Sequence, residues 1–399
     1  MFMSLAGIVF GVGFFIVTQA QTSGFEEFFV KTILGTNGTL RIEDRFQPTL
    51  FAMDVPDKLA EGSITVASEG NRKYIAGVEE PGRVSEAVRK FKAVSGLSVV
   101  LQGPATLETN TTSGDDVRVY GINLDDHLGV SDMAEQIVRG DLADFRQSPG
   151  GALVGSMLAT RLHINVGAVF TMKDAGEVRR YRVSAIYETG VSDIDKVRVF
   201  IHLPEARSLL QKPTGASFIQ VKLFDRDQAP EVAEQMESVI HHSVTPWQKR
   251  EKTWLDVFRA LRLSSAITVS TIILVSGLGM FNTLAMIVME KTKEIAILRS
   301  MGYTRGDISR IFLWQGALVL VGGTVLGWVF GAAATWIVSH VPIRIRGIFS
   351  TDSFVVSWSI WHYVVAAATA VVVVMTASLI PARRAARLEP GDVIRGTAQ

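Results

Sequence analysis

Apolar residues along this chain gather in four long runs, which cover residues 1–20, 263–289, 311–339 and 360–380. Each run supplies roughly 20 or more mostly apolar residues, the length that an α-helix needs to cross a hydrocarbon core of about 30 Å. The pattern therefore predicts four membrane helices, one before and three after a long polar segment.

The polar segment mixes short β-branched runs with amphipathic stretches. Residues 97–103 read as a strand, residues 83–96 have a helical period with a glycine stop, and residues 150–162 are predicted as a short helix. We therefore expect an α+β domain over residues 38–250 that consists of two subdomains, with the nested one at about 126–215.

The first apolar run continues into an amphipathic stretch, so the first helix and its extension are predicted to cover residues 1–37. Gly35 and Gly38 are expected to stop it. No Lys or Arg precedes the run. This favours a membrane helix whose basic upstream segment is missing over a cleaved signal peptide that ends at Ala20.

Basic residues cluster at the ends of the last three runs. They are Lys291, Lys293, Arg299, Arg305 and Arg310 between the second and third runs, and Arg383, Arg384, Arg387 and Arg395 after the fourth. The positive-inside rule places both clusters in the cytoplasm and the long polar segment outside. The net charge of +1, without a basic stripe interleaved with aromatics, gives no reason to expect nucleic-acid binding.

Motifs for hydrolysis and metalloprotease chemistry are absent. The sequence contains no cysteine, no H-E-x-x-H and no G-x-S-x-G. The neighbouring His241 and His242 would point in different directions on a helix, so we expect a surface role and no metal site. The adjacent acidic residues Asp125 and Asp126, like Asp193 and Asp195, are predicted to form turns. We therefore expect a chain that is not itself an enzyme.

Ionisable residues are nearly missing from the apolar runs, where His362 near one end is the exception. Carriers driven by protons or sodium need such groups inside the membrane, so the composition argues against this class. Small residues repeat every fourth position instead, which predicts close helix packing without saying whether the partner helix is in the same chain. They are Gly7 and Gly11 in the first run and Gly323, Gly327 and Gly331 in the third.

A charged, amphipathic elbow at about residues 290–310 connects the second and third runs. Its apolar side, between charged residues and a turn, fits either a protein partner or the membrane surface. The residues expected to make the contact are Glu290, Lys291, Glu294, Ile295, Leu298, Gly302 and Arg305.

Residues 289–316, MEKTKEIAILRSMGYTRGDISRIFLWQG, resemble the corresponding segment of ABC-transporter permeases of the macrolide-exporter and FtsX superfamily. Residues 381–396, PARRAARLEPGDVIRG, are similar to the C-terminal signature of that superfamily. The stretches AILRSMG and IFLWQG, with GIVFGVGFFIV at 7–17 and the segment 188–206, look most like lipoprotein-releasing permeases of the LolC and LolE type.

The resemblance implies a membrane α-helical protein with a large extracytoplasmic α+β domain inserted between its first and second helices. Residues 251–399 would form the FtsX-like permease domain, with the elbow as coupling helix on a cytoplasmic ABC ATPase dimer. ATP and Mg would be bound by that partner, because this chain has no G-x-x-x-x-G-K-[ST] loop. The location implied is the bacterial inner membrane, with both termini in the cytoplasm and the large domain in the periplasm.

The resemblance also implies a second permease, either a copy or a paralogue, lipoprotein cargo and a periplasmic lipid-binding carrier. Acyl chains favour apolar surfaces, which makes Phe14, Phe15, Phe25, Phe28 and Phe29 candidates for contact with lipid or cargo. Two alternatives share the same frame. One is an efflux permease like the macrolide exporter, and the other is a regulator of an external hydrolase, like FtsX, which transports nothing.

Overall fold

The computed structural model describes residues 2–44, 50–51, 66–67, 77–109, 114–240, 242–342 and 354–387. The chain divides into two compact units. The helical unit contains residues 1–29, 253–344 and 351–399, and the α+β unit contains residues 30–252 and 345–350.

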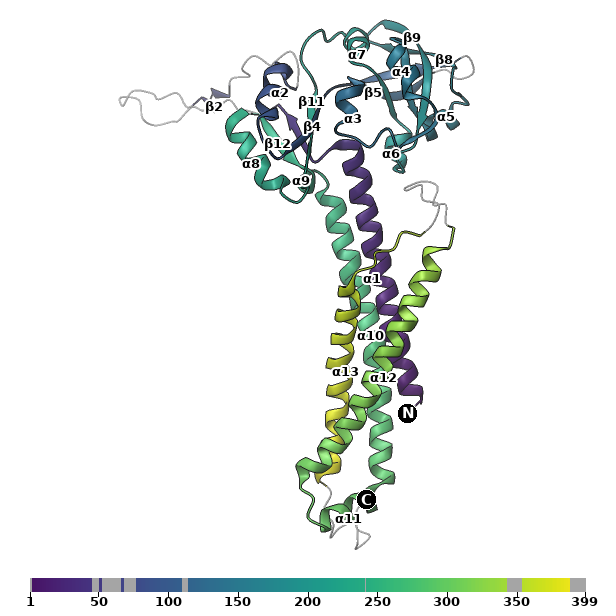
Figure 1. Ribbon diagram of the computed structural model, residues 1–399, viewed down its shortest axis with the longest axis vertical. Helices are drawn as coiled ribbons and strands as arrows, with labels where there is room; N and C mark the ends of the chain where they lie inside the picture. The colour runs from purple at the N-terminus through teal and green to yellow at the C-terminus, as the bar shows by residue number, and fades with distance from the viewer. Residues whose placement is uncertain are drawn as a thin grey trace, which may run out of the picture. The chain divides into compact units, whose positions relative to one another are not determined.

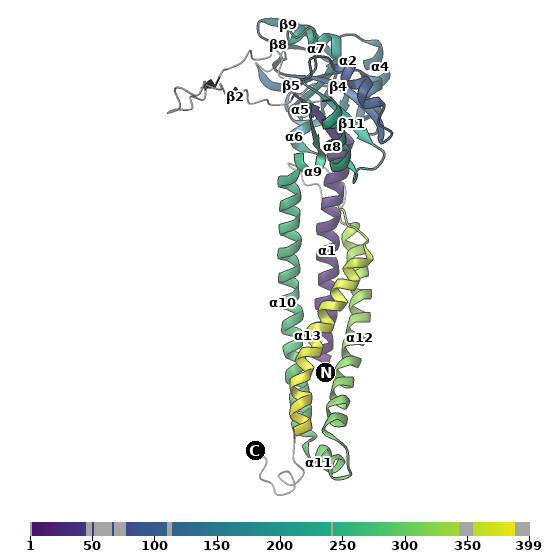
Figure 2. The ribbon, with the colours of Figure 1, turned by 90° about the vertical axis from the view of Figure 1, so that its left-hand side faces the viewer.

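Long helices form the helical unit, and the short helix α11 connects two of them at one end (Figures 1 and 2). They are α1 (Phe2–Asn37), α10 (Lys252–Glu290), α11 (Thr292–Ser300), α12 (Arg305–Ser339) and α13 (Ile360–Arg387). Four of them are long and apolar enough to cross a membrane, as the sequence predicts. The last residues of α1, from Val30 on, belong to the α+β unit.

The interior of the helical unit is a continuous apolar cluster. Ile8 and Val12 of α1 lie in it with Ile273 of α10, Leu320 of α12 and Val374 of α13. Side chains on the outer faces of the same helices are apolar and exposed, as expected for helices surrounded by lipid.

Strands and short helices alternate in the α+β unit. The strands are β1 (Leu40–Glu43), β2 (Leu50–Phe51), β3 (Val66–Ala67), β4 (Val94–Glu108), β5 (Asp115–Ile122), β6 (Ile137–Gly140), β7 (Gly151–Gly155), β8 (Val169–Asp174), β9 (Glu177–Tyr187), β10 (Arg198–His202), β11 (Phe218–Leu223) and β12 (Ser243–Pro246). The helices are α2 (Pro81–Arg89), α3 (Leu124–Leu128), α4 (Leu142–Gln147), α5 (Ser156–Arg161), α6 (Ser192–Asp195), α7 (Leu203–Leu209), α8 (Ala229–Ile240) and α9 (Trp247–Arg250).

The larger sheet has the order β12-β1-β11-β4-β5-β10-β7-β9-β6, and β8 pairs with both β4 and β9, while β2 and β3 pair with each other. The pairing of β8 closes β4, β5, β10, β7, β9 and β8 into a ring around a buried apolar core. We call this ring, with β6 and α4 to α7, the barrel half. The strands β12, β1, β11 and the start of β4, with α2 and α8, form the sheet half.

One prediction about this unit is wrong. Residues 150–162 do not form one helix, because Gly151–Gly155 is strand β7 and only Ser156–Arg161 is helical. All residues of β7 are buried, and a short continuous apolar run has no period that distinguishes a buried strand from a helix. The limits of the nested part stay a prediction, and β5 just before it pairs with both β4 and β10.

The first helix passes Gly35 and ends at Asn37, directly before Gly38, whose φ of +67° only glycine adopts easily. Gly35 therefore does not stop the helix as expected. Its neighbours in the α+β unit hold the last turn in helical form, because the backbone N–H of Asp132 donates to the carbonyl of Gly35 at 2.7 Å.

Candidate functional site

The elbow between the second and third membrane helices is a short helix with defined ends. α10 ends at Glu290, α11 covers Thr292–Ser300, and Gly302 turns the chain with a φ of +101°. Thr304 then caps α12 in a capping box, in which its side chain and that of Asp307 each bind the other's backbone N–H. The elbow therefore runs from the end of α10 to the capped start of α12.

The apolar side of α11 is split between two faces. Ile295 is 3% exposed and lies in the apolar core of the helical unit, and Leu298 packs against the same core. Ile297 is exposed on the other side. Both Ile295 and Leu298 thus fasten α11 to its own bundle, and their contact with a partner stays a prediction.

The exposed part of the elbow combines apolar and charged side chains, and we call it the elbow surface. It consists of Glu290, Lys291, Lys293, Glu294, Ile297, Met301, Gly302, Tyr303 and Arg305. Lys291 donates to Glu294 at 2.6 Å, and this bond raises the pKa of Lys291. Apolar residues within a polar rim, with Met, Tyr and Arg among them, are typical of protein interfaces.

A hydrogen bond links α11 to the end of α13. Arg299 donates from Nη1 to the carbonyl of Ala386 at 3.1 Å. Cations near a helix C-terminus bind its unpaired carbonyl groups and interact favourably with the helix dipole. The elbow is thus fastened to α13 as well as to the two helices that it connects.

The glycines of α12 face α1 of the same chain. A Cβ atom at Gly323 would lie 2.8 Å from Cγ2 of Ile8, and one at Gly327 would lie 2.8 Å from Cβ of Val12. Gly331 faces Ile16 in the same way. No larger residue fits at these distances, so the backbones approach closely.

The other side of α1 lies against α10, which it meets along most of its length. Gly7 faces Ser276 and Gly11 faces Ile273 at distances that leave no room for a Cβ atom. Polar contacts join the same two helices, and sequence reasoning missed them because single polar residues in an apolar run carry no pattern. They are Ser4 with Thr283, Gln19 with Ser265, and the ion pair of Glu26 with Arg262.

The phenylalanines of α1 differ in exposure. Phe14 is 52% exposed, whereas Phe15 and Phe29 are each 2% exposed. Phe29 packs against Trp254 and Phe258 with both ring centroids 5.4 Å away. Phe15 and Phe29 therefore do not belong to an exposed lipid-facing surface in this structure, and Phe14 does. Phe25 and Phe28 are half-buried.

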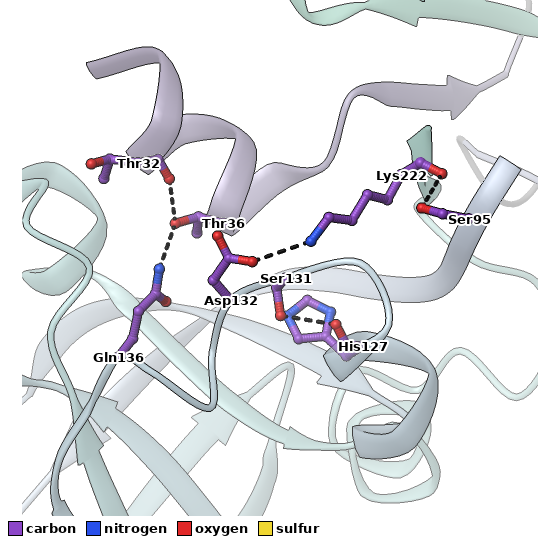
Figure 3. Close-up of polar contacts among 8 residues, drawn as sticks. All are labelled: Thr32, Thr36, Ser95, His127, Ser131, Asp132, Gln136 and Lys222. Carbon is purple, nitrogen blue, oxygen red and sulfur yellow. Dashed lines mark hydrogen bonds and ion pairs between the residues drawn. The ribbon is translucent and has the colours of Figure 1, made fainter. Parts of the chain in front are cut away.

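The last turn of α1 is bound within the α+β unit (Figure 3). Gln136 donates to Thr36 at 3.5 Å, and Lys222 pairs with Asp132 at 3.2 Å. Arg198 of β10 donates to Asn37 at 2.9 Å. These polar residues come from separate loops and strands, so no local sequence pattern could have brought them together.

Buried polar side chains with shifted pKa values, His127 and Asp195 among them, lie elsewhere in the α+β unit. Burial lowers the pKa of His127 to about 4, and its Nδ1 lies 3.2 Å from Oγ of the buried Ser98. Burial raises the pKa of Asp195 to about 6 although Thr189 donates two hydrogen bonds to it. Asp195 is thus a buried carboxylate, which was not expected from its turn-like sequence context.

Among the described residues, no three or more His, Cys, Asp or Glu side chains form a cluster that could hold a metal ion. His242 interacts through Nδ1 with the carbonyl of Ile240 at 2.7 Å, and His241 lies outside the described residues. The charged and apolar elbow surface and the contacts of α1 are therefore the features that point to a function.

Two family models match this chain. The MacB-like periplasmic core domain matches residues 1–239, and the FtsX-like permease C-terminal domain matches residues 266–390. Together they cover α1, the α+β unit and the bundle with its elbow.

Known membrane transport proteins are similar to this chain over all or part of its length. The lipoprotein-releasing system transmembrane protein LolC of Xylella fastidiosa (strain 9a5c) is 22% identical, with 98% of this chain and 92% of that protein covered. The macrolide export ATP-binding/permease protein MacB of Shewanella sp. (strain W3-18-1) is 35% identical over 133 residues, which are 33% of this chain and 19% of that protein.

Among solved structures, the periplasmic region of MacB from Actinobacillus actinomycetemcomitans is similar to this chain. The match covers 55% of this chain and 93% of the solved chain, with 12% identity and a TM-score of 0.35. The two family models cover most of the chain in the order that its helices and α+β unit follow. The chain belongs to the family of ABC-transporter permeases in which a MacB-like periplasmic core domain precedes an FtsX-like permease domain.

Proposed function

We propose that this chain is the membrane subunit of an ABC transporter that releases lipoproteins from the inner membrane by transmitting ATP-driven motion to its periplasmic domain. The similarity to LolC carries the proposal, since it extends over 98% of this chain and 92% of the relative. A match of this extent includes the elbow, the bundle and the α+β unit together.

The elbow surface is the proposed contact with a cytoplasmic ATPase dimer, which would bind ATP and Mg. Ile297, Met301 and Tyr303 supply exposed apolar area, and Glu294 and Arg305 supply charge beside it. Such a composition suits a protein partner better than a lipid surface, because an interfacial helix buries one continuous apolar face. In α11 the buried apolar face is already occupied by the bundle.

Force on the elbow would reach the rest of the bundle through contacts already described. Ile295 and Arg299 tie α11 to the core and to α13. Gly323 and Gly327 of α12 lie against Ile8 and Val12, so that a shift of α12 presses directly on α1. Tightly packed helices transmit displacements because their interiors have low compressibility.

The proposed cargo is a protein whose lipid anchor lies in the outer leaflet. Phe14 offers an exposed apolar surface on α1 for an acyl chain. The location that goes with this function is the bacterial inner membrane, with both chain termini in the cytoplasm. A second permease, as a copy or a paralogue, and a periplasmic lipid-binding carrier would complete the system.

An efflux permease is the second candidate, and the 35% identity with MacB over 133 residues favours it. That function predicts a periplasmic adaptor and an outer-membrane channel in place of a lipid-binding carrier. A regulator of an external hydrolase would activate that enzyme and would bind no lipoprotein.

Affinity purification of the full chain in mild detergent, followed by mass spectrometry, tests these functions. Lipoprotein release predicts an ABC ATPase, a second permease and acylated proteins in one complex. An adaptor without acylated cargo would favour efflux, and a periplasmic hydrolase alone would favour regulation. If no ATPase copurifies under conditions that keep the bundle folded, the proposal fails.

A further inference from the structure

The larger sheet of the α+β unit has an edge that no described strand covers. β6 ends the strand order and pairs on one side with β9. At the opposite end of the order, β12 finishes with Pro246, which has no N–H to donate to a further strand. β6 contains no proline, and its Val138 is 56% exposed. An edge of this kind is a template for pairing with another chain.

The backbone groups of Ile137 point to the free side of β6. The N–H of Glu188 donates to the carbonyl of Gln136 at 2.8 Å, and Ile137 lies opposite Tyr187. Successive residues of an antiparallel strand bind alternately to its two sides, so Ile137 directs its N–H and its carbonyl away from β9. Among the described residues, no backbone group on that side hydrogen-bonds to Ile137. A donor and an acceptor are therefore available to an added strand.

A bulge in β6 turns two neighbouring side chains into one hollow. The register with β9 shifts between Ile137 and Arg139, which leaves Val138 as the extra residue. In a regular strand, successive side chains point to opposite faces. Here Val138 and Arg139 both line a hollow of about 770 Å³, together with Met157 and Thr160 of α5. The free edge thus borders a groove whose other wall is a helix.

Apolar side chains make up much of the lining of this hollow. They are Val138, Met157, Ala159, Ile164 and Ile186. Binding sites in proteins combine such a lining with a few placed polar groups. A peptide that adds as a strand beside β6 directs alternate side chains to one face, so every second residue of it enters the hollow.

Arg139 determines which charge on a peptide fits. Its side chain is exposed, and among the described residues it has no ion-pair partner. The lining also contains Arg161, which already pairs with Asp115 at 2.7 Å, and it contains His163 and Glu188. The unpaired guanidinium of Arg139 favours a peptide that carries carboxylates, because opposite charges on neighbouring strands attract each other.

We propose that the free edge of β6 and the facing side of α5 form a docking groove for an extended acidic peptide segment of a partner protein. The segment pairs with Ile137, places alternate apolar side chains in the hollow and meets Arg139 with a carboxylate. Strand addition to an exposed sheet edge is a recurring mode of peptide recognition, in which backbone bonds give affinity and side-chain pockets give specificity. The inference goes beyond the proposed function and does not depend on it, since it concerns binding by the α+β unit alone.

Binding of defined peptides to the full chain in detergent tests the groove. The first probe is a fluorescein-labelled peptide of about ten residues, within the range of common strand lengths, in which valine and glutamate alternate. The second has lysine in place of glutamate. The third repeats the first with N-methyl groups on neighbouring central residues, so that neither of its edges can pair. We expect fluorescence anisotropy to show the tightest binding for the first peptide.

The other outcomes of this measurement count against the proposal. Equal binding of the N-methylated peptide would overturn strand addition, and equal binding of the lysine peptide would overturn the acidic partner. Absence of binding by all three peptides would overturn the groove itself.

Variants of β6 test whether the peptide binds there. Arg139→Glu should weaken binding of the glutamate peptide by about three- to tenfold and strengthen that of the lysine peptide, because it replaces attraction by repulsion. Ile137→Pro removes the outward N–H, keeps the bonds to β9 and should also weaken binding. Arg180→Glu, at an exposed position of β9 outside the hollow, is the matched control. Equal affinities of Arg139→Glu and this control would overturn the assignment, also where thermal melts show that Ile137→Pro has unfolded.

Two measurements identify what covers the edge. Hydrogen exchange of Ile137–Gly140 should slow when the glutamate peptide binds, because the amide of Ile137 becomes hydrogen-bonded. Unchanged exchange there would place the peptide elsewhere and overturn the proposal. The sequence has no cysteine, so Val138→Cys introduces a single thiol, which we expect the bound peptide to protect from maleimide. A disulfide-linked dimer of this variant without peptide would show that a second copy covers the edge, and it would overturn the peptide as occupant.

Discussion

The guanidinium of Arg299, in the last turn of α11, donates a hydrogen bond of 3.1 Å to the carbonyl of Ala386 in the last turn of α13. Ala382, Ala385 and Ala386 are buried at the same helix end, so α11 lies close to α13 there. The short elbow is therefore connected to three long helices, α10 and α12 through the chain and α13 through this bond.

Arg299→Ala is expected to leave ATPase binding intact and to lower transport per ATP hydrolysed. The carbonyl of Ala386 loses its charged donor, a bond worth about 1.5–3 kcal/mol, and α13 no longer follows the elbow. Parallel assays of ATP hydrolysis and cargo release measure the ratio. Arg384→Ala, at an exposed position of the same helix end, is the control and should behave like the unsubstituted chain. Equal ratios in both variants would contradict the role of Arg299.

Glu294 and Gly302 are expected to be needed for coupling. Glu294→Ala removes an exposed carboxylate that Lys291 binds at 2.6 Å, and Gly302→Val forces a β-branched residue into a φ of +101°. Both should separate ATP hydrolysis from transport while the α+β unit stays folded, which circular dichroism and thermal melts can follow. Unchanged transport in both variants would count against the elbow as the contact with the ATPase.

Gly327→Val is expected to separate α1 from α12. Its Cβ atom would lie 2.8 Å from Cβ of Val12, and overpacking of this kind costs about 1–3 kcal/mol. Melting of the full chain in detergent should show a lower Tm. Gly322→Val is the matched control, since the nearest atom to its added Cβ, on Leu5, lies at 3.8 Å. Equal Tm values for the two variants would contradict the close approach.

Phe14 and Phe15 are adjacent and are expected to respond in opposite ways. Phe15→Ala removes a side chain that is 2% exposed and should lower stability by about 3–5 kcal/mol. Phe14→Ala removes one that is 52% exposed and should leave the Tm nearly unchanged while weakening contact with an acylated cargo. Photo-crosslinking from position 14 to cargo, beside melts of both variants, checks this. Crosslinks from position 14 to phospholipid alone would contradict a cargo contact.

Asp195→Asn is expected to change how stability depends on pH. The folded-state pKa of Asp195 is about 6, raised above the usual 3.8 by burial, so folding favours the protonated form. Its contribution to stability is full below about pH 4 and is lost as the pH rises through 6. Asparagine carries no charge and can still accept the bonds of Thr189, so the variant should be more stable above pH 6 by about 1–3 kcal/mol.

Thermal melts of the full chain from pH 4 to pH 8 measure this difference. Asp193→Asn, at an exposed position of the same helix, is the control and should follow the unsubstituted chain. Parallel curves for Asp195→Asn and the control across this range would show that the buried carboxylate does not titrate there.

Several features of this protein follow from the sequence alone. Four apolar runs separated by charged segments determine the membrane helices, because only helices satisfy their backbone polar groups in lipid. The elbow at 290–310 is equally evident, since its charges interrupt two such runs and its residues carry a family resemblance. Both signals are local, and each can be read within a short window of the chain.

Tertiary structure decided which face of each element is used. Periodicity put Ile295, Ile297 and Leu298 on one apolar side, yet the bundle buries the first and leaves Ile297 exposed. The glycine repeat of α12 gave no partner until packing placed Ile8 and Val12 against it.

The contact of Gly35 with Asp132 joins residues that lie far apart in the chain. The burial of Asp195 also depends on neighbouring strands, since its own sequence context looks like an exposed turn. Such features arise from long-range packing, whose energy depends on which residues surround a side chain in space. A local sequence pattern does not specify those neighbours.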